Sequence, residues 1–109
     1  MAFNPKISNL ALVKIAGTFA DKAGILQPFD FHLICRRLVG TELQEWLKDS
    51  ADIDKKMLPL IEDWDKVIDD DRNKIPYTPD GMQAIFDLPG MPVIILNKYL
   101  ADVGAKAKN

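Results

Sequence analysis

The sequence contains one dominant periodic stretch, MLPLIEDWDKVI at residues 57–68. Its apolar residues fall three, one, three, three and one positions apart, which is the spacing of a helix with one apolar face. These residues are Met57, Leu60, Ile61, Trp64, Val67 and Ile68. Because Pro59 lacks a backbone N–H, we expect the helix to begin around Lys55–Leu58 with Pro59 in its first turn, or else to kink there.

Two further helices are expected downstream, after a polar loop over residues 69–77. Thr78 followed by Pro79 has the pattern of an N-cap and a first helical residue, and Met82, Ile85 and Phe86 supply the inward face. Pro89 and Gly90 then break the chain. The last helix is expected to contain Pro92 in its first turn and apolar residues at helical spacing after it. Gly104 suits the C-terminal cap of this helix. Those repeating residues are Leu96, Tyr99, Leu100 and Val103.

Upstream of the periodic stretch, residues 29–35 alternate between apolar and polar side chains, apart from Ile34, which indicates a half-buried strand. Gly17 and Gly24 could bracket a partner strand in a hairpin. Thr41 and Gln44 have the spacing of a capping box, so we expect a helix from Thr41 to about Asp49. Residues 1–24 otherwise form a poorly defined arm, and residues 105–109 a frayed tail.

The sequence therefore predicts a single domain over residues 1–109 that is mainly α, with four short helices preceded by an N-terminal strand or β-hairpin. The chain has 109 residues, of which 48% are hydrophobic, so one continuous core can be buried. The longest apolar run, near Val93–Leu96, is far shorter than the ~20 residues of a membrane span. The N-terminus lacks a secretory pattern, and we expect a cytosolic protein.

The composition argues against several function classes. Cys35 and His32 are the single cysteine and histidine, so a disulfide within the chain and a Cys/His zinc site are excluded. Residues 49–87 hold eleven acids against five bases, and a phosphate-binding protein needs a basic stripe instead. We expect no nucleic acid partner, no membrane, no cofactor and no metal.

Two groups of acidic residues have spacings that suggest catalytic or metal sites. The spacing of Asp69, Asp71 and Asn73 matches the first ligands of an EF-hand calcium loop. Lys74, however, occupies the position at which that loop needs glycine. Glu62, Asp63 and Asp65 flank Trp64, and on the expected helix the two aspartates point to different sides. A hydrated polar surface is the simpler interpretation of both groups, and we expect no enzyme.

The segment from Leu88 to Ile95 has more apolar surface than one side of a helix can bury in so small a protein. Its apolar residues are the candidate protein-binding site: Leu88, Met91, Val93, Ile94 and Ile95. If they form a docking surface, Met91→Asp or Ile94→Asp weakens partner binding without unfolding the protein.

The order of these signals resembles the short tail assembly chaperones of long-tailed phages and prophages. The resemblance covers about residues 26–103 and rests on a series of short motifs. They are Cys35-Arg36-Arg37-Leu38, Thr41-Glu42-Leu43, Asp63-Trp64 with the acidic loop, Tyr77-Thr78-Pro79, and Pro89-Gly90 before an apolar helix with Tyr99.

This resemblance implies a protein in the host bacterial cytoplasm that binds the tape measure protein during tail assembly and is absent from the mature virion. In that family a frameshifted longer form often recruits the tail tube protein, and the sequence leaves open whether this chain has such a form. A structural or adaptor subunit of the phage tail is the alternative. The sequence leaves the oligomeric state open, including a homo-oligomer.

Overall fold

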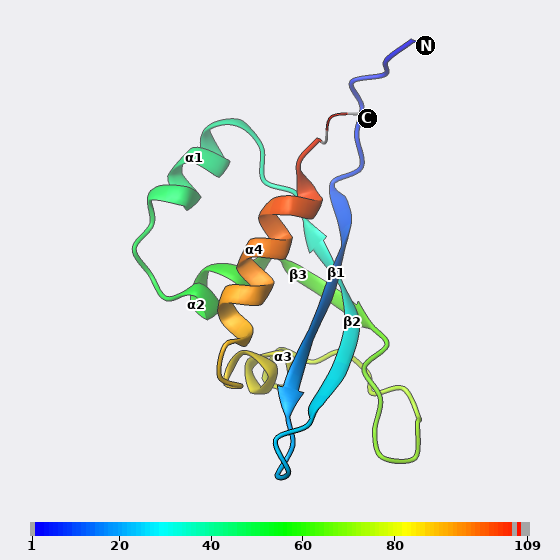
Figure 1. Ribbon diagram of the computed structural model, residues 1–109. Coiled ribbons are helices and arrows are strands. Elements are labelled where there is room, and N and C mark those ends of the chain that lie inside the picture. The colour runs from blue at the N-terminus through cyan, green and yellow to red at the C-terminus, as the bar shows by residue number, and fades with distance from the viewer. Residues whose placement is uncertain (1, 106, 108–109) are drawn as a thin grey trace.

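Three antiparallel strands and four α-helices make up the described part of the chain, residues 2–105 and 107, in a computed structural model (Figure 1). The strands are β1 (Leu10–Ala20), β2 (Leu26–Arg36) and β3 (Ile61–Asp65), with β2 in the middle of the sheet. The helices are α1 (Gly40–Lys48), α2 (Ile53–Met57), α3 (Pro79–Phe86) and α4 (Met91–Val103), and a 3₁₀ turn, η1 (Leu58–Leu60), follows α2.

The predicted mainly α class is wrong, because 28% of the structure is strand and 36% is helix. The protein has a small α/β fold. Much of the additional strand comes from the segment over residues 1–24, expected to be a poorly defined arm, in which β1 forms. Met1 lies outside the described residues, as do three of the five positions of the expected frayed tail, 105–109.

The long hairpin of β1 and β2 is the main structural unit of the sheet. The two strands pair over their whole length, from Leu10 opposite Arg36 to Ala20 opposite Leu26. The predicted strand within β2 is confirmed. The partner strand runs through Gly17 and does not start there, because this glycine makes close packing in the middle of the strand and no turn.

The hairpin turn is stabilised by one aspartate. The carboxylate oxygen Oδ1 of Asp21 accepts hydrogen bonds from the backbone N–H groups of Ala23, at 2.8 Å, and Ile25, at 3.0 Å. Gly24 has a φ of +80°, a left-handed conformation that glycine adopts without strain. Local turn chemistry therefore sets the end of the hairpin.

The helix predicted over residues 57–68 does not form. Helix α2 ends at Met57, Pro59 lies in the 3₁₀ turn η1, and the chain then enters β3. Pro59 is placed in a first turn, as predicted, but this turn is not continued into an α-helix. Ile61 and Trp64 are buried as expected, although on a strand and not on a helix.

A β-bulge explains why the strand has the apolar spacing of a helix. Cys35 of β2 pairs with Ile61, and the preceding Ile34 pairs with Asp63, so Glu62 is an extra residue in β3. The extra residue lets positions 61 and 64 both face the core although they are three apart, whereas a regular strand alternates every second residue.

The two predicted helix caps have different outcomes. Thr78 caps α3 as predicted, because its hydroxyl oxygen accepts a hydrogen bond from the N–H of Gly81 at 3.0 Å. The capping box of Thr41 and Gln44 is wrong, since Val39 is the N-cap of α1 and no side chain caps it. Helix α1 begins at Gly40, one residue before the threonine that would have to precede it.

The core lies between one face of the sheet and the helices, above all α4. Every fourth residue of α4 is buried: Met91, Ile95, Tyr99 and Val103. These side chains belong to one cluster with the inward residues of the two long strands, which are Ala11, Val13, Ile15, Phe31, Leu33 and Cys35. The phenol of Tyr99 donates a hydrogen bond to the carbonyl oxygen of Arg36 at 2.8 Å, so its polar end is satisfied inside the core.

Two charged side chains fasten the C-terminal end of α4 to the hairpin. A carboxylate oxygen of Asp102 accepts a hydrogen bond from the backbone N–H of Lys14, at 3.0 Å. Arg37 donates to the carbonyl oxygen of Val103 and, at 3.1 Å, to that of Ser8. Arg37 therefore supplies a donor to a helix end whose last carbonyls have no partner within the helix.

Helix α1 is attached to the rest of the molecule through Trp46 and Leu43, which pack against the core, and through an ion pair of Glu42 with Arg36. It contributes no buried residue and projects at the end of the molecule opposite the hairpin turn (Figure 1). The indole of Trp46 packs 5.7 Å from the ring of Tyr99 and donates a hydrogen bond to the carbonyl oxygen of Lys56 at 3.1 Å. Leu47, on the neighbouring position, is 52% exposed.

Candidate protein-binding groove

The fold buries some residues of the predicted docking segment and leaves others exposed. Met91 and Ile95 are buried in the core, with 2% and 0% of their surface exposed, so neither is available to a partner. Leu88 and Val93 are 42% and 55% exposed, and Ile94 is half-buried. The expectation that Met91→Asp leaves the protein folded is corrected accordingly, because that change places a charge in the core.

Leu88 borders an apolar groove at the hairpin end of the molecule. The groove lies between the ends of β1 and β2, the chain that follows β3, and the junction of α3 and α4, which approach one another at the lower end of Figure 1. Its volume is about 270 Å³. We call it the hairpin groove; it is lined by Phe19, Phe29, Asp30, Phe31, Lys66, Val67, Ile68, Ile85, Leu88 and Met91.

A row of three phenylalanines forms one wall of the hairpin groove. The rings of Phe19 and Phe29 stack with centroids 5.2 Å apart, and those of Phe29 and Phe31 with centroids 6.3 Å apart. Gly17 makes room for this row, because a Cβ atom at that position would lie 2.7 Å from Cζ of Phe29. The alternation of β2 predicts the facing of Phe29 and Phe31, but Phe19 comes from a strand that the sequence did not define.

An ion pair forms the polar rim of the groove. Nζ of Lys66 lies 3.3 Å from Oδ2 of Asp30, and both side chains are largely exposed. Lys66 has a φ of +65°, an uncommon conformation for a residue with a side chain. This residue turns the chain after β3, so that Val67 and Ile68 reach the groove.

Several apolar side chains at the margin of the groove are exposed to solvent. The exposed fraction is 49% for Ile68, 42% for Leu88 and 38% for Phe19. Eight of the ten lining residues are apolar. A solvent-exposed apolar surface with a polar rim is typical of a protein interaction site.

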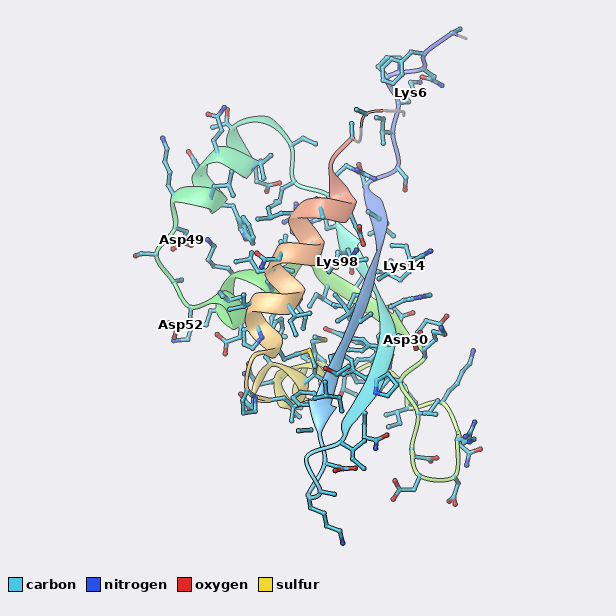
Figure 2. All side chains as sticks on the ribbon, in the orientation of Figure 1. Lys6, Lys14, Asp30, Asp49, Asp52 and Lys98 are labelled. Atoms are coloured by element: carbon cyan, nitrogen blue, oxygen red, sulfur yellow. The ribbon has the colours of Figure 1, made fainter. Side chains whose placement is uncertain are left out.

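The chain segments that form the groove contain more acidic than basic residues. The three segments that form it, residues 18–31, 65–74 and 79–91, contain eight acids and four bases, whereas the rest of the chain contains eight acids and ten bases. Asp69 directly follows Ile68, and Asp87 directly precedes Leu88. Figure 2 shows Asp30 toward this end of β2.

The acidic loop considered for calcium is organised by its own hydrogen bonds. One carboxylate oxygen of Asp69 accepts from the backbone N–H groups of Asp71 and Asn73, both at 2.9 Å. Arg72 has a φ of +64° within this turn. The spacing of oxygen-bearing residues therefore belongs to an aspartate-stabilised turn. Within residues 2–105 and 107, no three His, Cys, Asp or Glu side chains are placed to hold a metal ion.

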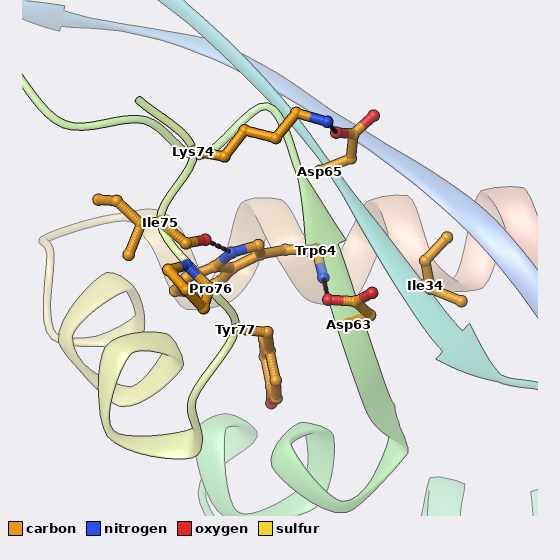
Figure 3. Close-up of a pocket in the computed structure, with 8 residues that line it drawn as sticks. All are labelled: Ile34, Asp63, Trp64, Asp65, Lys74, Ile75, Pro76 and Tyr77. Carbon is orange, nitrogen blue, oxygen red and sulfur yellow. Dashed lines mark hydrogen bonds and ion pairs between the residues drawn. The ribbon is translucent and has the colours of Figure 1, made fainter. Parts of the chain in front are cut away.

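Trp64 borders a separate open hollow of about 460 Å³ beside β3 (Figure 3). Its indole N–H donates to the carbonyl oxygen of Ile75 at 2.7 Å, and its ring meets that of Tyr77 edge-on at 5.1 Å. Asp63 and Asp65 lie on the same face of β3, because residues two apart on a strand share a face. The expectation that they point to different sides of a helix is therefore wrong. Asp65 faces Lys74 at 3.9 Å. These contacts attach the loop after β3 to the sheet.

His32 and Cys35 lie on opposite faces of β2. His32 is on the face away from the core, opposite Lys14 on one side and Asp65 on the other. Cys35 is fully buried, and burial raises the pKa of its thiol to about 12. The thiol is therefore protonated near neutral pH and is a poor nucleophile. Cys35 is therefore a small core residue.

Fold and groove together define a small α/β protein with a solvent-exposed apolar site in an acidic setting. Comparison with protein families, curated proteins and solved structures finds no match to this chain. Among the described residues, no single helix is long and apolar enough to cross a membrane. The pair α3 and α4 reaches that length and composition together, but is bent by 109° at its junction.

Proposed function

We propose that this protein is a phage tail assembly chaperone that binds the tape measure protein and keeps it soluble during tail assembly. The observation that carries the proposal is the hairpin groove, an exposed apolar site formed by chain segments that contain more acids than bases. A chaperone that holds a client needs apolar contact area together with enough charge to stay soluble itself. The order of sequence motifs that resembles tail assembly chaperones supports the choice of client.

The lining of the groove supports binding without catalysis. Asp30 and Lys66 are its only charged lining residues, and they pair with each other at 3.3 Å. The remaining lining side chains are aliphatic, aromatic or thioether groups, which contribute contact area and no acid, base or nucleophile. The groove therefore suits a holding function.

Co-expression with a tape measure protein tests the proposal. We expect the tape measure protein to be mostly insoluble alone and soluble when co-expressed, and the two proteins to co-purify. Leu88→Asp places a charge in the groove and should abolish both effects. Leu47→Asp is the matched control, because it changes an exposed leucine on α1. Equal solubility with and without the chaperone would refute the proposal.

The proposed location is the host bacterial cytoplasm, with the protein absent from the mature virion. Mass spectrometry of purified phage particles distinguishes this from a structural or adaptor subunit, because a retained subunit is found in stoichiometric amounts. We expect the protein in lysates of infected cells and none in the particles. Its recovery from particles would favour the subunit.

A further inference from the structure

We propose that the hairpin groove recognises a basic amphipathic helix, with apolar side chains seated in the groove and lysine or arginine side chains facing its acidic surroundings. This inference rests on the proposed function, in which the groove is the client site, and specifies the chemistry of the client segment. It is drawn from the size of the groove, its hydrogen-bonding groups and the charges around it.

The size of the groove favours protruding side chains as its occupants. Its volume of about 270 Å³ lies below the roughly 300–1,000 Å³ of sites that enclose small molecules. Phe19, Ile68 and Leu88 at its margin are partly exposed, so they can extend contact to a surface larger than the groove. A ridge of apolar side chains on a partner fits this shape.

The hydrogen-bonding groups favour a helix over an extended segment. The charged lining side chains, Asp30 and Lys66, are paired with each other. A bound extended segment needs partners for its backbone groups, as at the edge of a sheet, whereas a helix satisfies its own. An amphipathic helix needs only a complementary apolar surface, which the six apolar lining residues other than the buried Phe31 and Met91 provide.

The charges select a basic helix. Asp69 and Asp87 adjoin the lining residues Ile68 and Leu88 directly in the chain. The three segments that form the groove have four more acids than bases, and the rest of the chain has two more bases than acids. Complementary charge around an apolar contact raises the association rate and excludes acidic competitors.

Fluorescence anisotropy with three labelled synthetic peptides tests this inference on the full chain. The first peptide is a helix with a leucine stripe and lysines on its polar face, the second carries glutamates in place of the lysines, and the third is a scrambled version of the first. We expect the lysine peptide to bind about tenfold or more tighter than the glutamate peptide at low salt, with the difference shrinking at 1 M salt. The scrambled peptide should bind no better than the glutamate peptide.

Matched variants locate the interaction. Ile68→Asp should remove binding of the lysine peptide, and Leu47→Asp on α1 should not. Asp70→Asn with Asp71→Asn should weaken that binding severalfold, whereas the same loss of charge in Glu45→Gln with Asp52→Asn should not; Asp52 lies on the loop between α1 and α2 (Figure 2). Circular dichroism confirms that each variant is folded.

The outcomes separate this inference from the proposed function. Equal binding of lysine and glutamate peptides, or equal binding of the scrambled peptide, overturns the inference even when the tape measure protein is held in solution. Preference for the lysine peptide without any effect on the tape measure protein retains the inference about the groove and refutes the proposed client.

Discussion

Gly17 is the residue on which the aromatic wall depends. A Cβ atom there would come within 2.7 Å of the Phe29 ring, so Gly17→Val must displace that ring. We expect the free energy of unfolding to fall by about 1–3 kcal/mol, as for other overpacked sites, and binding at the groove to weaken. Urea denaturation measures the first effect. Ala16→Val, at an exposed position of the same strand, should change stability by less than about 0.5 kcal/mol.

The burial of Cys35 predicts that the protein loses stability at alkaline pH. Its thiol pKa rises from the ordinary 9.0 to about 12 because the group is buried, and burial also raises the pKa of Tyr99. Since unfolding restores a lower pKa, the folded state holds these protons more tightly. The stabilisation is complete below about pH 9 and is lost as the pH rises toward 12.

The measurement is denaturant unfolding between pH 7 and pH 11. We expect a flat profile at the lower end and a loss of stability above about pH 9. Cys35→Ala should reduce the slope of that loss while lowering stability at every pH, because it removes a buried group. A profile of unchanged slope would show that Cys35 does not contribute.

At the scale of elements, the cap of α3 offers a direct comparison. Thr78→Ala removes the hydroxyl that accepts from Gly81 and should lower the free energy of unfolding by about 1 kcal/mol. Thr41→Ala is the internal control, because no side chain caps α1, and should cost less than about 0.5 kcal/mol. Thermal and urea denaturation of both variants check the difference; equal losses would contradict the assignment of the caps.

Elements with local signals were predictable from the sequence, and β3 was not. Helices α3 and α4 each begin at a sequence pattern that fixes their start, namely Thr78-Pro79 and Gly90 with Pro92. The identity of β3 depends on the bulge at Glu62, which is defined only by pairing with β2. The apolar spacing of residues 57–68 fits a helix equally well, so periodicity alone cannot decide between them.

At the scale of the whole molecule, the groove was only partly visible in the sequence. Leu88 and Met91 were among the predicted binding residues, and of these only Leu88 is substantially exposed. The remaining lining residues come from segments around positions 19–31 and 66–68. Chain topology brings these segments together, and no local pattern records that proximity. The exposed Val93 lies outside the groove lining.

The free edge of β1 leads to a prediction about the state of the molecule in solution. Asp102 accepts the N–H of Lys14, a backbone group that would otherwise point outward from the edge strand. Asp102→Ala should therefore increase concentration-dependent self-association, measured by sedimentation velocity. Lys98→Ala removes the 3.3 Å ion pair with Asp102 but leaves the carboxylate in place. This variant should self-associate no more than the parent protein.

The wider consequence concerns polymerisation. A strand of eleven residues at the border of a sheet offers a template on which other extended chains can grow into fibrils. A single carboxylate, reaching across from α4, occupies one site of that template and adds negative charge beside it. The carboxylate of Asp102 therefore acts against side-by-side pairing of copies through backbone hydrogen bonds, which is separate from the proposed side-chain binding at the groove.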